Sequence, residues 1–132
     1  MAETKSIHIG DILTITTGRL VSHDHVGGAY NILDWMTGES LMTHQLPRAA
    51  DVCKPFLEAT FPQLAAIVYP SYLEVDGVSA DAIFTWLDTQ GELYGEWWDV
   101  PKLPIDAYDA KNAIIELAEM IGTDKTIIGV VI

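Results

Sequence analysis

The residues with the clearest chemical potential are carboxylates in the second half of the chain. No lysine or arginine occurs between Lys54 and Lys102, and this interval contains eight carboxylates. If the helix that Ser79 begins continues past Gly91, four of these carboxylates form a flank along one side of it: Asp81, Asp88, Glu92 and Glu96. Such a flank attracts basic surfaces and repels nucleic acid and anionic membranes.

The dipeptide Trp97-Trp98 extends this acidic flank, because it lies between Glu96 and Asp99. An exposed tryptophan beside carboxylates offers stacking to arginine or lysine, as many interface hot spots do. In an extended segment, one of two consecutive tryptophans faces each way. The candidate residues for partner binding are therefore Asp81, Asp88, Glu92, Glu96, Trp97, Trp98 and Asp99. The alternative interpretation is that the carboxylates serve only solubility and the tryptophans fill the core.

A second group with chemical potential is His23-Asp24-His25. In a strand, both imidazoles would point to one face and could begin a metal site. His8 and His44 are isolated, and no zinc-binding or phosphate-loop spacing occurs in the chain. The sequence therefore predicts no metal, no cofactor and no catalytic residue. A small metal-dependent hydrolase organised around His23, Asp24, His25 and His44 remains the alternative function.

Composition indicates the class of protein. The 132 residues suit one domain over 1–132, and 49% of them are hydrophobic. The net charge is -12, most of it carried after residue 70. Apolar runs are too short to span a bilayer, and the N-terminus has no apolar signal core. Cys53 is the only cysteine, falls on an apolar helix face and permits no disulfide framework. We therefore expect a cytoplasmic protein that binds neither membrane nor nucleic acid directly.

Two stretches near the N-terminus share a pattern, DILTITTG at 11–18 and NILDWMTG at 31–38. Apolar residues in and before each stretch recur at helical spacing, and each stretch closes on Thr-Gly. A glycine after the last helical turn adopts positive φ freely, so we expect helices that end at Gly18 and Gly38. Alternating β-branched residues leave a strand as the alternative for the first stretch.

The rest of the chain alternates helices with extended segments. We expect a helix from Pro47 that Pro55 kinks or divides, a helix capped by Ser79, and a core helix over 109–121. Strands are expected in three segments: 66–76, 96–104 and 126–132. The sequence thus predicts an α+β fold, mostly helical, with four to five helices packed on a small sheet of two to four strands.

Four segments, in this order, resemble a family of small uncharacterised proteins encoded by phages and prophages: DILTITTGRLVS, GGAYNILDWMTGESLMTHQLPR, FPQL and YGEWWDVPKLP. The block TGESLMTHQLPR is the most specific. The family has no established reaction, so no catalytic residue is carried over. The resemblance implies an accessory role in the host cytoplasm. By analogy, small acidic phage proteins such as anti-CRISPR and other anti-defence proteins often occupy a host protein's nucleic-acid-binding surface.

These observations together predict a noncatalytic interaction protein. Its acidic second half would bind and inhibit a basic, nucleic-acid-binding surface of a host protein or nucleoprotein complex, such as a bacterial defence complex. A third function class is a self-associating phage structural or morphogenesis component, with the C-terminal GVVI as its pairing edge. A homodimer is also left open.

Overall fold

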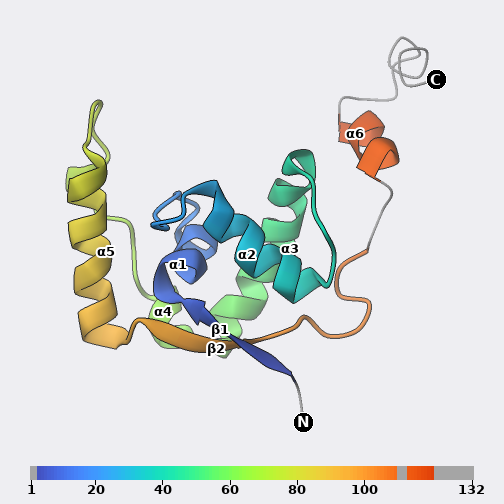
Figure 1. The fold of residues 1–132 in the computed structure, drawn as a ribbon, viewed down its shortest axis with the longest axis horizontal. Helices are drawn as coiled ribbons and strands as arrows, with labels where there is room; N and C mark the ends of the chain where they lie inside the picture. The colour runs from blue at the N-terminus through green and yellow to red at the C-terminus, as the bar shows by residue number, and fades with distance from the viewer. Residues whose placement is uncertain (1–2, 110–112, 121–132) are drawn as a thin grey trace.

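The computed structural model describes residues 3–109 and 113–120 (Figure 1). Its helices and strands, in chain order, are β1 (Thr4–His8), α1 (Ile9–Thr17), α2 (Val26–Thr37), α3 (Leu46–Thr60), α4 (Pro62–Ala65), α5 (Ala80–Tyr94), β2 (Trp97–Pro101) and α6 (Ala113–Met120). Two 3₁₀ turns, η1 (Thr43–Gln45) and η2 (Ser71–Leu73), lie in the connections. The predicted α+β, mostly helical fold is confirmed.

Strands β1 and β2 pair antiparallel and place one face of the ladder against the core. Ile7 lies opposite Trp98 in the register. Ile7 and Val100 are fully buried, whereas Trp97 and Asp99 are exposed, as the alternation of side chains along a strand requires. In Figure 1 the two strands run beneath helices α1, α2 and α3. The ladder therefore joins the start of the chain to the segment that follows α5.

Helix α1 is the central element of the core. It contacts β1, α2, α3, α4 and α5, and all of its residues from Ile9 to Thr16 are buried. Gly18 and Gly38 follow α1 and α2 with φ of 72° and 73°, so both predicted helix ends are confirmed. The strand alternative for 11–18 is wrong. The apolar and threonine side chains of this segment are buried on all sides of the helix, so the β-branched alternation along the sequence does not indicate a strand here.

The buried carboxylate of Asp11 is the centre of a hydrogen-bond network. It accepts hydrogen bonds from Ser22 Oγ at 2.6 Å and from the Asn31 side-chain amide at 2.9 Å. Lys5 Nζ donates to the Asn31 side-chain oxygen at 2.9 Å. Thr14 Oγ1 accepts from the Ser22 amide at 3.1 Å. The network satisfies a buried charge and fixes the loop between α1 and α2.

Helix α3 continues through Pro55, so of the two expectations for this proline, a kink or a division, the division is wrong. Pro47 lies in its first turn, as predicted. Ala49, Cys53 and Leu57 are fully buried on one face, whereas Pro55 is exposed. The hydrogen bond that Pro55 cannot make is therefore lost on the side where water can replace it, while packing of the opposite face retains the helix.

Segment 66–76 is not a strand, which corrects the prediction for it. It contains η2, with Pro70 immediately before it, and then a turn in which Gly77 has φ of 76°. Proline and the Asp-Gly turn interrupt the β-branched run before a ladder can form. β1 supplies the pairing partner of β2 instead. The strand expected at 126–132 lies outside the described residues.

Helix α6 is described from Ala113 to Met120, within the predicted 109–121, but it does not present its apolar side to the core. Ile114 is 56% exposed and Leu117 36%, whereas Glu116 is 2% exposed. The prediction of a core helix is therefore wrong for these residues. An ion pair, and not an apolar contact, decides which side of α6 faces the protein.

This ion pair joins Glu116 to Arg48 at the start of α3. Arg48 Nε donates to Glu116 Oε2 at 3.0 Å and its Nη2 to Oε1 at 2.9 Å, while Gln45 Nε2 lies 3.3 Å from Oε1. Arg48 also donates to the Asp109 carbonyl at 2.7 Å, and its guanidinium lies 4.3 Å from the centre of the Tyr108 ring. The hydrogen bonds from Arg48 lower the pKa of the Glu116 carboxyl.

We expect Arg48→Met to release α6, because it leaves the Glu116 carboxylate buried without its cation. Amide hydrogen exchange over 113–120 should then rise at neutral pH. In the parent protein the same release should follow acidification. A carboxyl whose pKa is lowered in the folded state stabilises above its unfolded pKa, and this contribution is lost as pH falls through the folded pKa.

Arg19→Met is the matched control, since the ion pair of Arg19 with Glu74 is exposed at both ends and contributes little. Equal exchange over 113–120 in both variants would contradict the role assigned to Arg48.

A second expectation concerns Gly28, which lies against the Asp11 network. A Cβ built on Gly28 would come within 2.2 Å of Ser22 Oγ and 2.4 Å of Asp11 Oδ1, so Gly28→Ala should destabilise the fold by about 1–3 kcal/mol. Gly27→Ala is the control, because the nearest atom to its Cβ is 3.6 Å away, and helix propensity should make it neutral or mildly stabilising. Urea unfolding midpoints measure both; coinciding midpoints would show that the network is not tightly packed.

Candidate partner-binding surface

Helix α5 begins as predicted and continues without a break through Gly91. Ser79 Oγ accepts a hydrogen bond from the Ala82 amide at 3.1 Å, which caps the first turn. Gly91 is buried, and a Cβ there would come within 3.0 Å of the Glu96 side chain. The glycine is therefore retained inside the helix by close packing, which compensates for its low helix propensity. In Figure 1, α5 forms one edge of the molecule.

Two side chains on the inner side of α5 attach it to the core. Trp86 is 8% exposed and Leu87 is fully buried. A Cβ on Gly10 would come within 2.9 Å of Leu87 Cδ2, so this glycine permits the close approach of α5 to α1. The apolar spacing of 83, 84, 87 and 94 in the sequence predicts that Tyr94 shares the inner side and does not include Trp86. Tyr94 is 42% exposed, since the last turn of α5 extends past the core.

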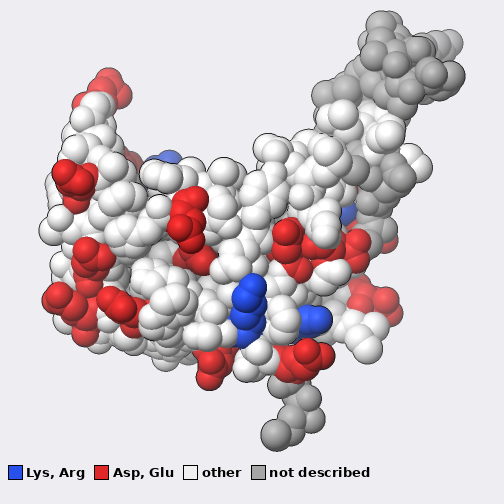
Figure 2. Space-filling view, in the orientation of Figure 1, with Lys and Arg blue, Asp and Glu red and all other residues white. Residues whose placement is uncertain are grey.

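The acidic stripe, which we define as Asp81, Asp88 and Glu92, lies on the solvent side of α5, and one of its members, Asp88, also contacts His23 where the stripe borders the loop before α2. All three residues are exposed, and helical geometry directs them away from the side that carries Trp86 and Leu87. At 1.5 Å per residue the stripe extends about 16 Å along the helix axis. Figure 2 shows Asp and Glu side chains along the left edge of the molecule, where α5 lies. The stripe therefore presents negative charge on one side.

Glu96 does not extend the stripe along the helix, which corrects the predicted flank. Helix α5 ends at Tyr94, and Gly95 turns the chain with φ of 102°. The Glu96 carbonyl then accepts from the Ile9 amide at 2.7 Å, which starts β2 beside β1. The Glu96 side chain is exposed and turned back toward Gly91, so its charge still lies near the C-terminal end of α5.

The two tryptophans of β2 face opposite ways, as alternation predicts. Trp97 is 62% exposed and lies on the same face of the strand as the exposed Asp99. Trp98 is half-buried, with its ring 5.2 Å from that of Phe61, and its indole N–H donates to the Gly95 carbonyl at 2.9 Å. Trp98 therefore has a packing role, and Trp97 is the aromatic side chain that a partner could reach.

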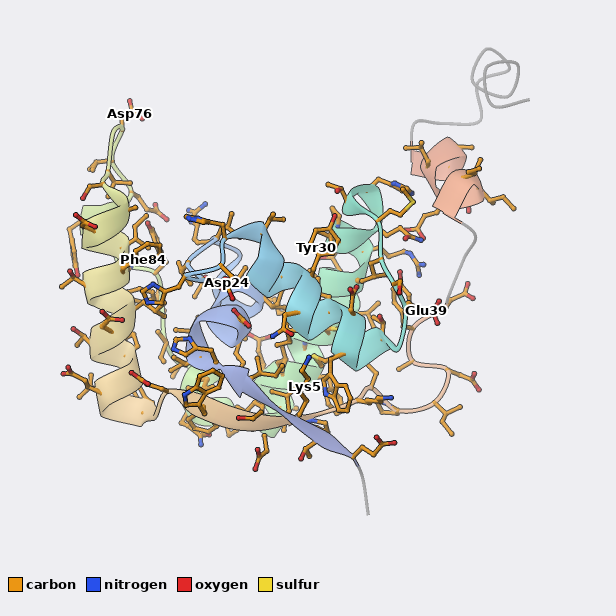
Figure 3. The ribbon with its side chains drawn as sticks, viewed as in Figure 1. Lys5, Asp24, Tyr30, Glu39, Asp76 and Phe84 are labelled. Carbon is orange, nitrogen blue, oxygen red and sulfur yellow. The ribbon has the colours of Figure 1, made fainter. Side chains whose placement is uncertain are left out.

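The segment 23–25 forms a turn and not the strand that a His-x-His metal pair requires. His23 Nε2 lies 3.2 Å from Asp88 Oδ1, and its ring lies 4.3 Å from that of Phe84, on the side of α5 that faces the rest of the molecule (Figure 3). His25 lies further from Phe84, with ring centres 6.0 Å apart. Over residues 3–109 and 113–120, no three His, Cys, Asp or Glu side chains are arranged to hold a metal ion. These contacts instead connect the loop before α2 to α5.

Cys53 is buried in α3, and burial raises the pKa of its thiol to about 12. The thiol is therefore protonated at neutral pH and is a poor nucleophile, and its burial agrees with the apolar helix face on which the sequence places it. His44, which the hydrolase alternative also invokes, lies in η1.

Comparison with known proteins gives a family match in the first half of the chain. Residues 7–67, slightly less than half of the chain, match a family described as Domain of unknown function (DUF7736). No curated protein and no solved structure matches the chain. The matched segment runs from β1 through α4, and the seven candidate partner-binding residues lie outside it. None of the helices in the described part of the chain has the length and apolar character of a bilayer-spanning segment.

The different environments of the two tryptophans give a direct test. Trp98→Ala should destabilise the fold by about 2–4 kcal/mol, because it removes packing against Phe61 and a hydrogen bond. Trp97→Ala should change the free energy of unfolding by less than about 0.5 kcal/mol, since most of its ring is in solvent. Urea denaturation measures both; a large loss of stability on Trp97→Ala would assign that ring to the core.

Proposed function

We propose that this protein is a noncatalytic phage accessory protein that acts in the host cytoplasm by binding a basic, nucleic-acid-binding surface of a host protein and inhibiting it. The observation that carries the proposal is the acidic stripe on the solvent side of α5, with the exposed Trp97 beyond its C-terminal end. A bacterial defence complex is one kind of target with such a surface. The phage setting comes from the sequence resemblance alone.

The mechanism is competition for lysine and arginine side chains that otherwise bind phosphate. Asp81, Asp88 and Glu92 offer carboxylates along one helix, and the neighbouring Glu96 and Asp99 are also exposed. Complementary charge steers the encounter and fixes orientation, while an aromatic ring that becomes buried on binding supplies affinity. Trp97 is placed to stack on a guanidinium of the partner. Because exposed charges are screened over about 8 Å at physiological ionic strength, binding should weaken as salt is added.

The test compares two triple variants with the same change of charge. The first, Asp81→Asn, Asp88→Asn and Glu92→Gln, removes the acidic stripe. The control, Glu3→Gln, Glu39→Gln and Asp106→Asn, neutralises three exposed carboxylates that lie on neither α5 nor β2. The parent protein is first used to isolate partners from host proteins that were enriched on heparin, and the affinity of each isolated partner is then measured by calorimetry at several salt concentrations.

We expect affinity to fall as salt rises, and DNA to compete with the protein for the partner. Loss of the stripe should weaken binding roughly tenfold, if each lost ion pair contributes about 0.5 kcal/mol, and the control triple should stay within about twofold. Trp97→Ala should weaken binding in addition, by more than about 1 kcal/mol. Affinity that does not respond to salt, or an equal loss in both triple variants, would reject the proposal.

A further inference from the structure

A cavity of about 460 Å³ opens between α1, α2 and α3, and no residue of α5 lines it. Its volume falls within the range of roughly 300–1,000 Å³ that small-molecule sites occupy. Apolar side chains form most of its wall: Ile15, Leu20, Ala29, Leu33, Leu46 and Ala50. Every lining residue lies within the matched segment 7–67, whereas the acidic stripe lies outside it. The cavity is therefore a feature of the part of the chain that the domain family shares.

The charged residues that line this cavity have a net positive charge, whereas the protein as a whole is negative. Two cations, Arg19 and Lys54, and one carboxylate, Asp51, are among the lining residues. The whole chain has 7 Lys and Arg against 19 Asp and Glu, so cations are scarce and two of them lie here. Arg19 forms an exposed ion pair with Glu74. Lys54 is exposed and makes no ion pair or hydrogen bond with any residue that the structure describes.

The hydroxyl groups that line the cavity already have partners. Thr14 Oγ1 donates to the Gly10 carbonyl at 2.8 Å and accepts from the amides that follow α1. Thr43 Oγ1 shares a hydrogen bond with the Tyr30 hydroxyl. The interior thus offers apolar contact, and the charged groups among its lining residues are Arg19, Lys54 and Asp51, one more cation than carboxylate. This division fits a molecule with an apolar body and a single anionic group.

We propose that the cavity binds a small monocarboxylate with an apolar tail. The tail packs between Leu33, Leu46 and Ala50, where removal of its surface from water provides most of the affinity. The carboxylate lies at the opening, where Lys54 neutralises it and Arg19 contributes when its contact with Glu74 loosens. The carboxylates of α5 do not line the cavity. Screening over about 8 Å limits their repulsion of the ligand at physiological salt.

The test uses octanoate as the probe, below its micelle concentration, with octanol and octylammonium as neutral and cationic analogues of equal tail length. Calorimetry and amide NMR should show one saturable site for octanoate, with shifts confined to residues that line the cavity. Octanol should bind more weakly and octylammonium most weakly. Absence of saturable octanoate binding at millimolar concentration, or equal affinity for the three probes, would overturn the proposal.

Two variants locate the site. Ala50→Phe fills the cavity and should abolish octanoate binding while far-UV circular dichroism is unchanged. Lys54→Gln is an exposed substitution that the fold tolerates, and it should weaken octanoate roughly two- to fivefold without affecting octanol. Lys102→Gln makes the same charge change outside the cavity, above the ring of Trp35, and should leave both affinities unchanged. An equal effect of Lys54→Gln and Lys102→Gln on octanoate affinity would show that Lys54 is not part of the site.

Discussion

Burial of the Asp11 carboxylate constrains how the elements around α1 can pack. A charge inside the core must keep its hydrogen-bond partners, so Ser22 and Asn31 have to lie at fixed positions beside α1. Those two residues belong to the loop before α2 and to α2 itself, which sets the position of that helix. Gly28 leaves room for this polar group, since a side chain there would displace Ser22 or Asp11.

Close packing also attaches α5 to the core through one side of the helix, so the residues on its other side are not needed for folding. Leu87 lies over Gly10 and is fully buried, and Trp86 lies beside it, so one side of α5 provides its attachment. The other side makes no contribution to the core and can carry any polar residue. His23 reaches Asp88 across the junction and joins the two parts at their surface, but this contact is exposed and weak. Polar residues on the outer side of α5 can therefore change without disturbing the packing of the matched segment.

The sequence predicted local structure better than tertiary placement. Gly18, Gly38 and Ser79 marked helix ends because capping depends on residues a few positions apart. The alternation of Trp97 and Trp98 was also predictable, because it follows from strand geometry. The side of α6 that faces the protein was not, since Arg48 and Glu116 are 68 residues apart in the chain. The cavity was overlooked for the same reason, because its wall comes from three helices and no single stretch contains its pattern.

Stability alone does not account for the acidic stripe. Like charges along one helix repel each other and lower the stability of the folded state, and exposed carboxylates gain little from being there. Solubility would be served equally by carboxylates spread over the surface and mixed with lysines. Trp97, 62% exposed in the same region, works against solubility, and its ring contacts that of His8 at 5.2 Å. The carboxylates of α5 and the exposed indole of Trp97 are both unfavourable in the isolated protein, and contact with a cationic surface would relieve both costs.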